Sequence, residues 1–135
     1  KEVLGLRVTM DLGANVTLTG GVALQTQESW CEFISKDLQS ISFGGNAAEL
    51  YFEEDKFDDF LKKLAALKGI FYVHPVQQYS WGQRVIRFYD PDFHILEVGE
   101  NMKSVCRRFL DSGMTIEAAA VRMNVPEKFV RACVR

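Results

Sequence analysis

Residues 81–98, WGQRVIRFYDPDFHILEV, carry the strongest structural signal in the sequence. Two segments, 83–89 and 93–98, are rich in β-branched and aromatic residues, and the turn Asp90-Pro91-Asp92 lies between them. Such segments favour strands, and proline and aspartate favour a tight turn. The stretch therefore predicts a β-hairpin.

The residues before this hairpin predict a strand, a helix and a further strand. Residues 48–53 have the composition of a strand, and Asp55 is the expected N-cap of the helix that follows. Apolar side chains then recur at helical spacing, at Phe57, Phe60, Leu61, Leu64 and Leu67. Residues 70–73 predict a short strand, which Pro75 is expected to end. Residues 46–99 thus have the predicted order strand, helix, strand, strand, strand.

The first 27 residues predict the end of the same pattern. Residues 1–5 predict the last turn of a helix closed by Gly5, and three short strands are expected at 6–12, 15–19 and 22–27. The segment 28–46 is expected to be irregular but packed. Two such units make an α+β domain with mostly antiparallel sheets. The predicted fold is therefore a pair of βαβββ modules whose first strand and most of whose first helix precede residue 1.

Residues 101–135 differ in kind from the rest. They predict three helices, over 104–110, 116–123 and 126–134, the second capped by Thr115. Residues 1–100 carry nine Lys/Arg against fifteen Asp/Glu, a net charge of −6, whereas the last segment carries seven against three, a net charge of +4. We therefore predict a domain at 1–100 followed by a basic helical extension at 101–135.

The composition excludes several classes of protein. Hydrophobic residues make up 47% of the chain, enough to form a core without disulfide or metal. No apolar run approaches the ~20 residues of a membrane-spanning helix. The three cysteines, Cys31, Cys106 and Cys133, form no CxxC pair. The sequence therefore predicts reduced thiols, a cytoplasmic location and no membrane partner.

The hairpin and its surroundings resemble the vicinal oxygen chelate superfamily, which includes glyoxalases, bleomycin-resistance proteins and extradiol dioxygenases. In that superfamily an aspartate-proline-aspartate-glycine turn precedes a strand that carries a glutamate. Here Phe93 stands at the glycine position and Glu97 lies on the strand. Residues 50–64 resemble the start of the second module, and residues 1–8 resemble the end of the first module's helix. The resemblance covers residues 1–99 and implies an open cup, a small-molecule ligand and a homodimer.

The same resemblance implies a metal site in many members, on the first and last strands of each module. There the metal acts as a Lewis acid. Glu97 matches the last-strand position of the second module, Glu49 falls where its first strand usually offers histidine, and Gln25 falls where the first module usually offers glutamate. The implied cofactor is Mn, Mg, Ni, Fe or Zn, and an all-oxygen set favours Mg²⁺ or Mn²⁺ over Zn²⁺. Other members hold no metal and sequester a ligand.

Three roles for Glu97 stay open: a buried acid paired with an arginine, a metal ligand, or a catalytic acid or base. An isolated buried charge is costly, so this carboxylate needs compensation. Arg87 and Gln83 share one strand face, and Arg87 is expected either to pair with Glu97 or to bind an anionic group of the ligand. Tyr79 and Trp81 are expected to wall a pocket, or to belong to the core or a dimer interface. The candidate ligand-binding residues are therefore Trp81, Arg87, Gln83 and Tyr79.

Three functions follow from these observations. The first is a metal-dependent enzyme with lyase, isomerase or dioxygenase-like chemistry, in which Glu97 is catalytic. The second is a metal-free protein of the same fold that binds a planar or aromatic molecule. The third is a ligand-sensing regulator that binds DNA through its C-terminal helices. Lys128, Arg131 and Arg135 are few basic residues for a DNA-binding helix, so nucleic acid is not the favoured partner.

Overall fold

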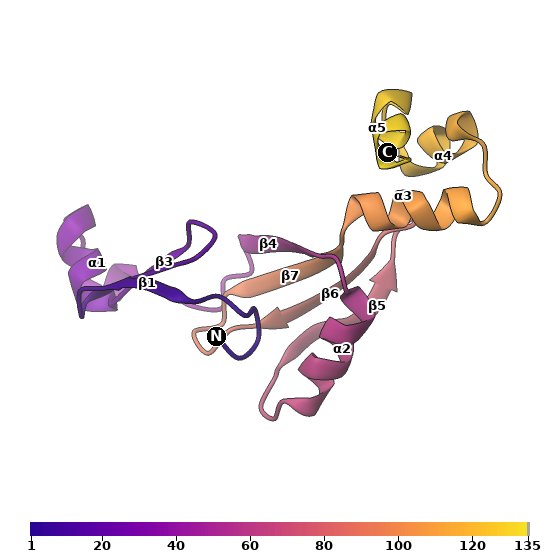
Figure 1. The fold of residues 1–135 in the computed structure, drawn as a ribbon. Helices are drawn as coiled ribbons and strands as arrows, with labels where there is room; N and C mark the ends of the chain where they lie inside the picture. The colour runs from indigo at the N-terminus through magenta and orange to yellow at the C-terminus, as the bar shows by residue number, and fades with distance from the viewer. Residues whose placement is uncertain (135) are drawn as a thin grey trace. The chain divides into compact units, whose positions relative to one another are not determined.

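The computed structural model describes residues 1–134, which form two compact units (Figure 1). The first unit is Lys1–Phe43, and the second begins at Gly44. Each unit combines a sheet with helices, which confirms the predicted α+β class. The predicted boundary near residue 100 stays a prediction.

The first unit contains a three-stranded antiparallel sheet in the order β1-β2-β3. Its strands are β1 (Val8–Asp11), β2 (Asn15–Leu18) and β3 (Ala23–Gln25). These are three of the strands predicted from the glycine-separated segments. Before them, the Gly5 N–H donates to the Lys1 carbonyl at 3.0 Å, which closes a single turn.

Two helices follow β3, where the sequence had predicted irregular structure. They are α1 (Gln27–Ile34) and the short 3-10 helix η1 (Leu38–Ser40). That prediction was wrong because side-chain and backbone caps stabilise both ends of α1. The Thr26 side chain accepts a hydrogen bond from the Ser29 N–H, and Ser35 ends the helix in the left-handed region with φ 55°.

The second unit contains a four-stranded sheet in the order β4-β7-β6-β5. The strands are β4 (Glu49–Glu54), β5 (Tyr72–Gln78), β6 (Arg84–Tyr89) and β7 (Ile95–Glu100). β4 runs parallel to β7, and the other neighbours are antiparallel. The predicted hairpin is β6–β7, in which Val85 lies opposite Gly99.

The prediction that Pro75 ends its strand was wrong, because β5 continues to Gln78. Proline has no N–H to donate to a sheet ladder, and it is therefore tolerated on edge strands. β5 is one of the two edge strands of this sheet.

One face of this sheet is covered by α2 (Phe57–Ala66) (Figure 1). Phe57, Phe60 and Leu64 of α2 are buried, and the ring centroid of Phe60 lies 6.5 Å from that of Phe88. The N-cap position is Lys56 and makes no side-chain cap bond, so the prediction of Asp55 was wrong by one residue. The strands contribute apolar side chains to this face, namely Ile86, Phe88, Leu96 and Val98.

Strand alternation directs the intervening residues to the opposite side of the sheet. We call this side the polar face; it is formed by Glu49 and Tyr51 of β4, Val85 and Arg87 of β6, and Glu97 and Gly99 of β7.

The three helices that the sequence predicted after the hairpin are present, and they gather at one end of the sheet (Figure 1). They are α3 (Met102–Asp111), α4 (Ile116–Met123) and α5 (Glu127–Cys133). They share an apolar core formed by Val105, Cys106, Phe109, Ala119, Ala120, Met123, Val130 and Cys133. Among the described residues, no helix is long and apolar enough to cross a membrane.

Candidate functional site

Four side chains converge on the guanidinium of Arg87. Its Nε donates to Glu49 Oε2 at 2.7 Å, and one Nη donates to Glu97. The other Nη donates to the Tyr79 hydroxyl at 2.6 Å and to His74 Nε2 at 3.3 Å. The sheet register explains this convergence, because Arg87 lies opposite Glu97 on one side and His74 on the other.

The pKa values of the two carboxyl groups in this cluster shift in opposite directions. The hydrogen bond from Arg87 lowers the pKa of Glu49. Burial raises the pKa of Glu97, of which only 6% is exposed, and this effect exceeds the attraction to Arg87. Proximity to a second carboxylate adds to the increase for Glu97. The pair therefore shares one guanidinium, with Glu49 the more acidic partner.

The imidazole of His74 lies between the guanidinium of Arg87 and the Pro75 carbonyl. An arginine side chain can only donate, so the Nε2 atom that faces Arg87 must accept. The Nδ1 atom lies 2.7 Å from the Pro75 carbonyl and therefore carries the proton. His74 thus adds a further contact to the guanidinium.

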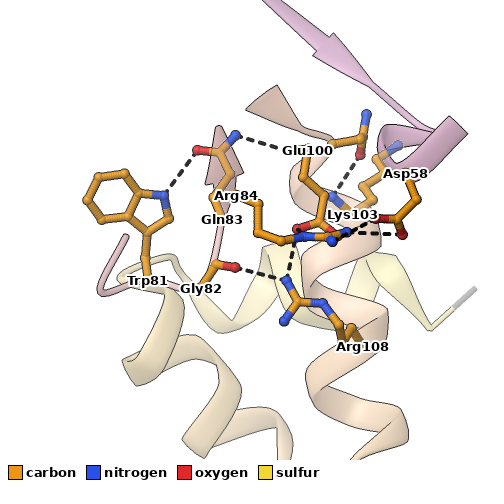
Figure 2. Close-up of polar contacts among 9 residues, drawn as sticks. Asp58, Trp81, Gly82, Gln83, Arg84, Glu100, Lys103 and Arg108 are labelled. Atoms are coloured by element: carbon orange, nitrogen blue, oxygen red, sulfur yellow. Dashed lines mark hydrogen bonds and ion pairs between the residues drawn. The ribbon is translucent and has the colours of Figure 1, made fainter. Parts of the chain in front are cut away.

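An aromatic group flanks the cluster. The rings of Tyr79 and Trp81 stack with centroids 4.5 Å apart. Figure 2 shows that the Trp81 Nε1 donates to Gln83 Oε1, at 3.1 Å. Gln83 Nε2 in turn donates to the Tyr51 hydroxyl at 2.9 Å. Burial raises the pKa of that phenol, so it stays protonated at neutral pH. The polar face thus combines a charged centre with a wall of three aromatic side chains.

The metal site implied by the sequence does not fit the second unit. No group of three or more His, Cys, Asp and Glu side chains capable of holding a metal occurs within residues 1–134. Glu97 and Glu49 are brought together, but as counter-ions of Arg87, so a cation there would have to displace a guanidinium. Gln25 belongs to the first unit, where it bonds with Asn15 at 3.1 Å and Ser29 at 3.0 Å.

The remaining predicted residues have distinct positions. Gln83 is 5% exposed and uses its amide within the protein, so it holds other side chains in place and does not offer a free donor. Arg87, Tyr79 and Trp81 are half-buried on or beside the polar face.

The sequence did not single out His74 for this cluster or Tyr51 for the wall. The sequence did contain a signal for Tyr51, because residues two positions apart on a strand share a face and Tyr51 is two positions after Glu49.

The fold and this site together define a class. A mixed sheet in the order β4-β7-β6-β5, with a helix on one face and a last-strand glutamate on the other, is the second βαβββ module of a vicinal oxygen chelate protein. The chain belongs to the glyoxalase-like domain family, whose family model matches residues 1–103.

Solved structures agree with this assignment. A protein of unknown function from Agrobacterium tumefaciens is 36% identical, over 73% of this chain and 77% of that chain, with a TM-score of 0.61. A member of the glyoxalase/bleomycin resistance protein/dioxygenase superfamily from Sphaerobacter thermophilus is 26% identical, over 73% and 80%, with a TM-score of 0.56. A lactoylglutathione lyase from Agrobacterium tumefaciens is 22% identical, over 75% and 79%, with a TM-score of 0.57, and shows the fold alone. No curated protein matches the chain.

Proposed function

We propose that this protein binds a small planar aromatic molecule, neutral or cationic, on the polar face and does so without a metal. One observation carries the proposal: the guanidinium of Arg87 is held by both Glu49 and Glu97. The two acids that a metal would require are thereby already neutralised in part. This supports the metal-free binding hypothesis over the metal-enzyme hypothesis.

The charge of the face indicates the charge of the ligand. Two carboxylates against one guanidinium give the cluster an excess of negative charge. Glu53 adds another carboxylate, which accepts from the Tyr51 hydroxyl at 3.1 Å. An anionic ligand would meet this excess charge unfavourably. A neutral or cationic ligand could donate hydrogen bonds to the exposed carboxylate oxygens of Glu49.

The aromatic wall indicates the shape of the ligand. Tyr51 is 48% exposed, and Trp81 and Tyr79 are half-buried, so ring surface remains accessible on this face. Stacking on such rings contributes ~0.5–1.5 kcal/mol beyond the area buried. A planar aromatic molecule would use this surface best.

The test is a fluorescence titration with proflavine, a planar aromatic cation, and with 2-naphthalenesulfonate, a planar aromatic anion. We expect saturable binding of proflavine that Trp81→Leu weakens roughly two- to tenfold, as the loss of one aromatic partner implies. Arg131→Met, which changes an exposed side chain of α5 in the same unit, is the control and should bind normally. Tighter binding of the sulfonate would contradict the charge argument.

Elemental analysis of protein purified without chelator separates the two leading hypotheses. We expect no stoichiometric divalent metal. About one metal per chain, lost in Glu97→Ala and in Glu49→Ala, would instead support the enzyme hypothesis, in which the ion acts as a Lewis acid.

We also propose the homodimer that the family resemblance implies. It is supported by the edge position of β5 and by exposed apolar side chains at Phe71, Tyr72, Val73 and Val76. Light scattering after size-exclusion chromatography measures the mass directly, and a monomer at all concentrations would contradict it.

A further inference from the structure

We infer that the C-terminal helices hold the aromatic wall of the binding face in position, through Arg108 and Phe109 of α3. The inference rests on the proposed function and extends it to residues beyond the stretch that the family model matches, which ends at residue 103. Arg108 and Phe109 act here as positioning residues.

The element they position is the tight turn of residues 79–83, which carries Tyr79, Trp81 and Gln83. The Gly82 N–H donates to the Tyr79 carbonyl at 2.8 Å, and the Tyr79 N–H donates to the Gln83 carbonyl at 2.9 Å. Gly82 has φ +89°, a conformation that L side chains rarely adopt. The turn therefore has one defined shape, and its placement depends on what contacts its backbone.

Phe109 is the first of these contacts. Its ring lies so close to the turn that a Cβ added at Gly82 would clash with Phe109 Cζ. No side chain fits between the α3 helix and the turn backbone. A movement of α3 toward the sheet would therefore push the turn directly.

Arg108 is the second contact, and it acts by hydrogen bonds (Figure 2). One Nη atom donates to the Gly82 carbonyl at 2.8 Å and to Glu100 Oε2 at 2.9 Å. Glu100 is 5% exposed and also pairs with Arg84 at 3.1 Å. Burial opposes the charge of Glu100, but the two arginines outweigh it and lower its pKa, so it stays ionised. Arg108 thus ties the turn to a fixed charged group at the end of β7.

From the turn, unbroken contacts reach the polar face. Gln83 Nε2 bonds the Glu100 carbonyl at 3.0 Å and the Tyr51 hydroxyl at 2.9 Å, while its Oε1 accepts from Trp81. Tyr79 stacks on Trp81 and accepts from Arg87. A shift of α3 therefore changes the placement of the aromatic rings relative to the charged cluster. The helical extension is in this way part of the binding site.

The experiment uses the full chain with Trp30→Phe, which leaves Trp81 as the single tryptophan of the two in the sequence. In this background, Arg108→Met removes the bond to the turn, and Arg107→Met is the matched control on an exposed position of the same helix. Acrylamide quenching and the emission maximum report on Trp81 without any ligand, and proflavine titration reports on binding.

We expect Arg108→Met to increase quenching of Trp81 and to weaken proflavine binding about three- to thirtyfold, the order expected for a group that acts through intervening contacts. Arg107→Met should change neither. Arg108→Lys keeps a charged donor for the Gly82 carbonyl and should recover part of the loss, which a purely structural defect would not show. Phe109→Leu, which keeps an apolar side chain in the helical core, should also increase quenching.

Two results separate the claims. Folded Arg108→Met and Phe109→Leu variants with unchanged Trp81 quenching would overturn the inference. Increased quenching in both variants, while no variant and not even the parent protein binds proflavine, would support the positioning by α3 and would reject the proposed function.

Discussion

Replacing Arg87 by methionine tests the charged cluster most directly. Methionine keeps much of the volume but leaves Glu97 buried without a partner, with 6% of the residue exposed. Removing one partner of a buried ion pair costs ~3–5 kcal/mol. Glu97 can escape part of this cost by binding a proton, since burial already raises its pKa. The Glu49 side chain is 38% exposed, so the loss of its ion pair with Arg87 adds little to the cost in unfolding free energy. We therefore expect a loss of about 3 kcal/mol near neutral pH, at the low end of that range.

The loss should depend on pH with a defined sign. A carboxyl group whose folded-state pKa is raised stabilises the fold below its ordinary pKa of 4.5, and this contribution is lost as the pH rises through the folded-state value. Without Arg87 the pKa of Glu97 rises further. The lowered pKa of Glu49 contributes stability above its ordinary value, and that contribution also depends on Arg87. Arg87→Met should therefore destabilise the protein most at high pH and least in acid.

The assay is urea unfolding followed by tryptophan fluorescence, at roughly one-unit steps from about pH 5 to about pH 8. Arg131→Met is the control, because Arg131 is 56% exposed and forms only surface ion pairs with Glu127 and Glu117. Such pairs contribute ~0–1 kcal/mol. A loss below about 1 kcal/mol at the highest pH, or a loss that grows toward acid, would refute the assignment of Glu97 as the buried partner of Arg87.

Three further predictions concern single positions. Gly82→Ala should cost ~1–3 kcal/mol more in unfolding free energy than Gly113→Ala. Both residues have positive φ, but of the two only Gly82 has an aromatic ring where the added Cβ would lie. Equal losses in chemical denaturation would contradict the contact with Phe109. Thr115→Ala should cost about 1 kcal/mol, since the Thr115 side chain accepts from the Ala118 N–H at 3.1 Å and caps α4; thermal unfolding measures this, and an unchanged Tm would argue against the cap. Burial raises the pKa of the Cys106 thiol to about 12. At mildly alkaline pH this thiol should therefore react with a disulfide reagent far more slowly in the folded protein than in urea. Fast labelling of Cys106 in the native state, located by mass spectrometry, would show that α3 opens.

Local patterns were enough to predict most of the elements. The β-branched and aromatic segments on either side of the Asp90-Pro91-Asp92 turn predicted the β6–β7 hairpin, and the helical spacing of apolar side chains predicted α2. The three C-terminal helices follow from caps and breakers that lie within a few residues of each helix. These signals are short-ranged, so a single sequence contains them in full. The errors at α1 and at Pro75 arose where a cap or an edge position altered what a residue type usually does, and the N-cap of α2 was misplaced by one residue.

The sequence alone determined less about the candidate site than about the secondary structure. The sequence by itself determined that Glu97 and Arg87 lie on strands, that each shares a face with particular neighbours, and that the acid needs compensation. Only the tertiary structure decided which compensation it receives. Arg87 meets Glu49, 38 positions away in the chain, and Gly82 meets Arg108, 26 positions away. Both contacts depend on strand order and register across the sheet, which no local periodicity encodes. The first of them makes Glu49, which the family resemblance implied as a metal ligand, a counter-ion of Arg87.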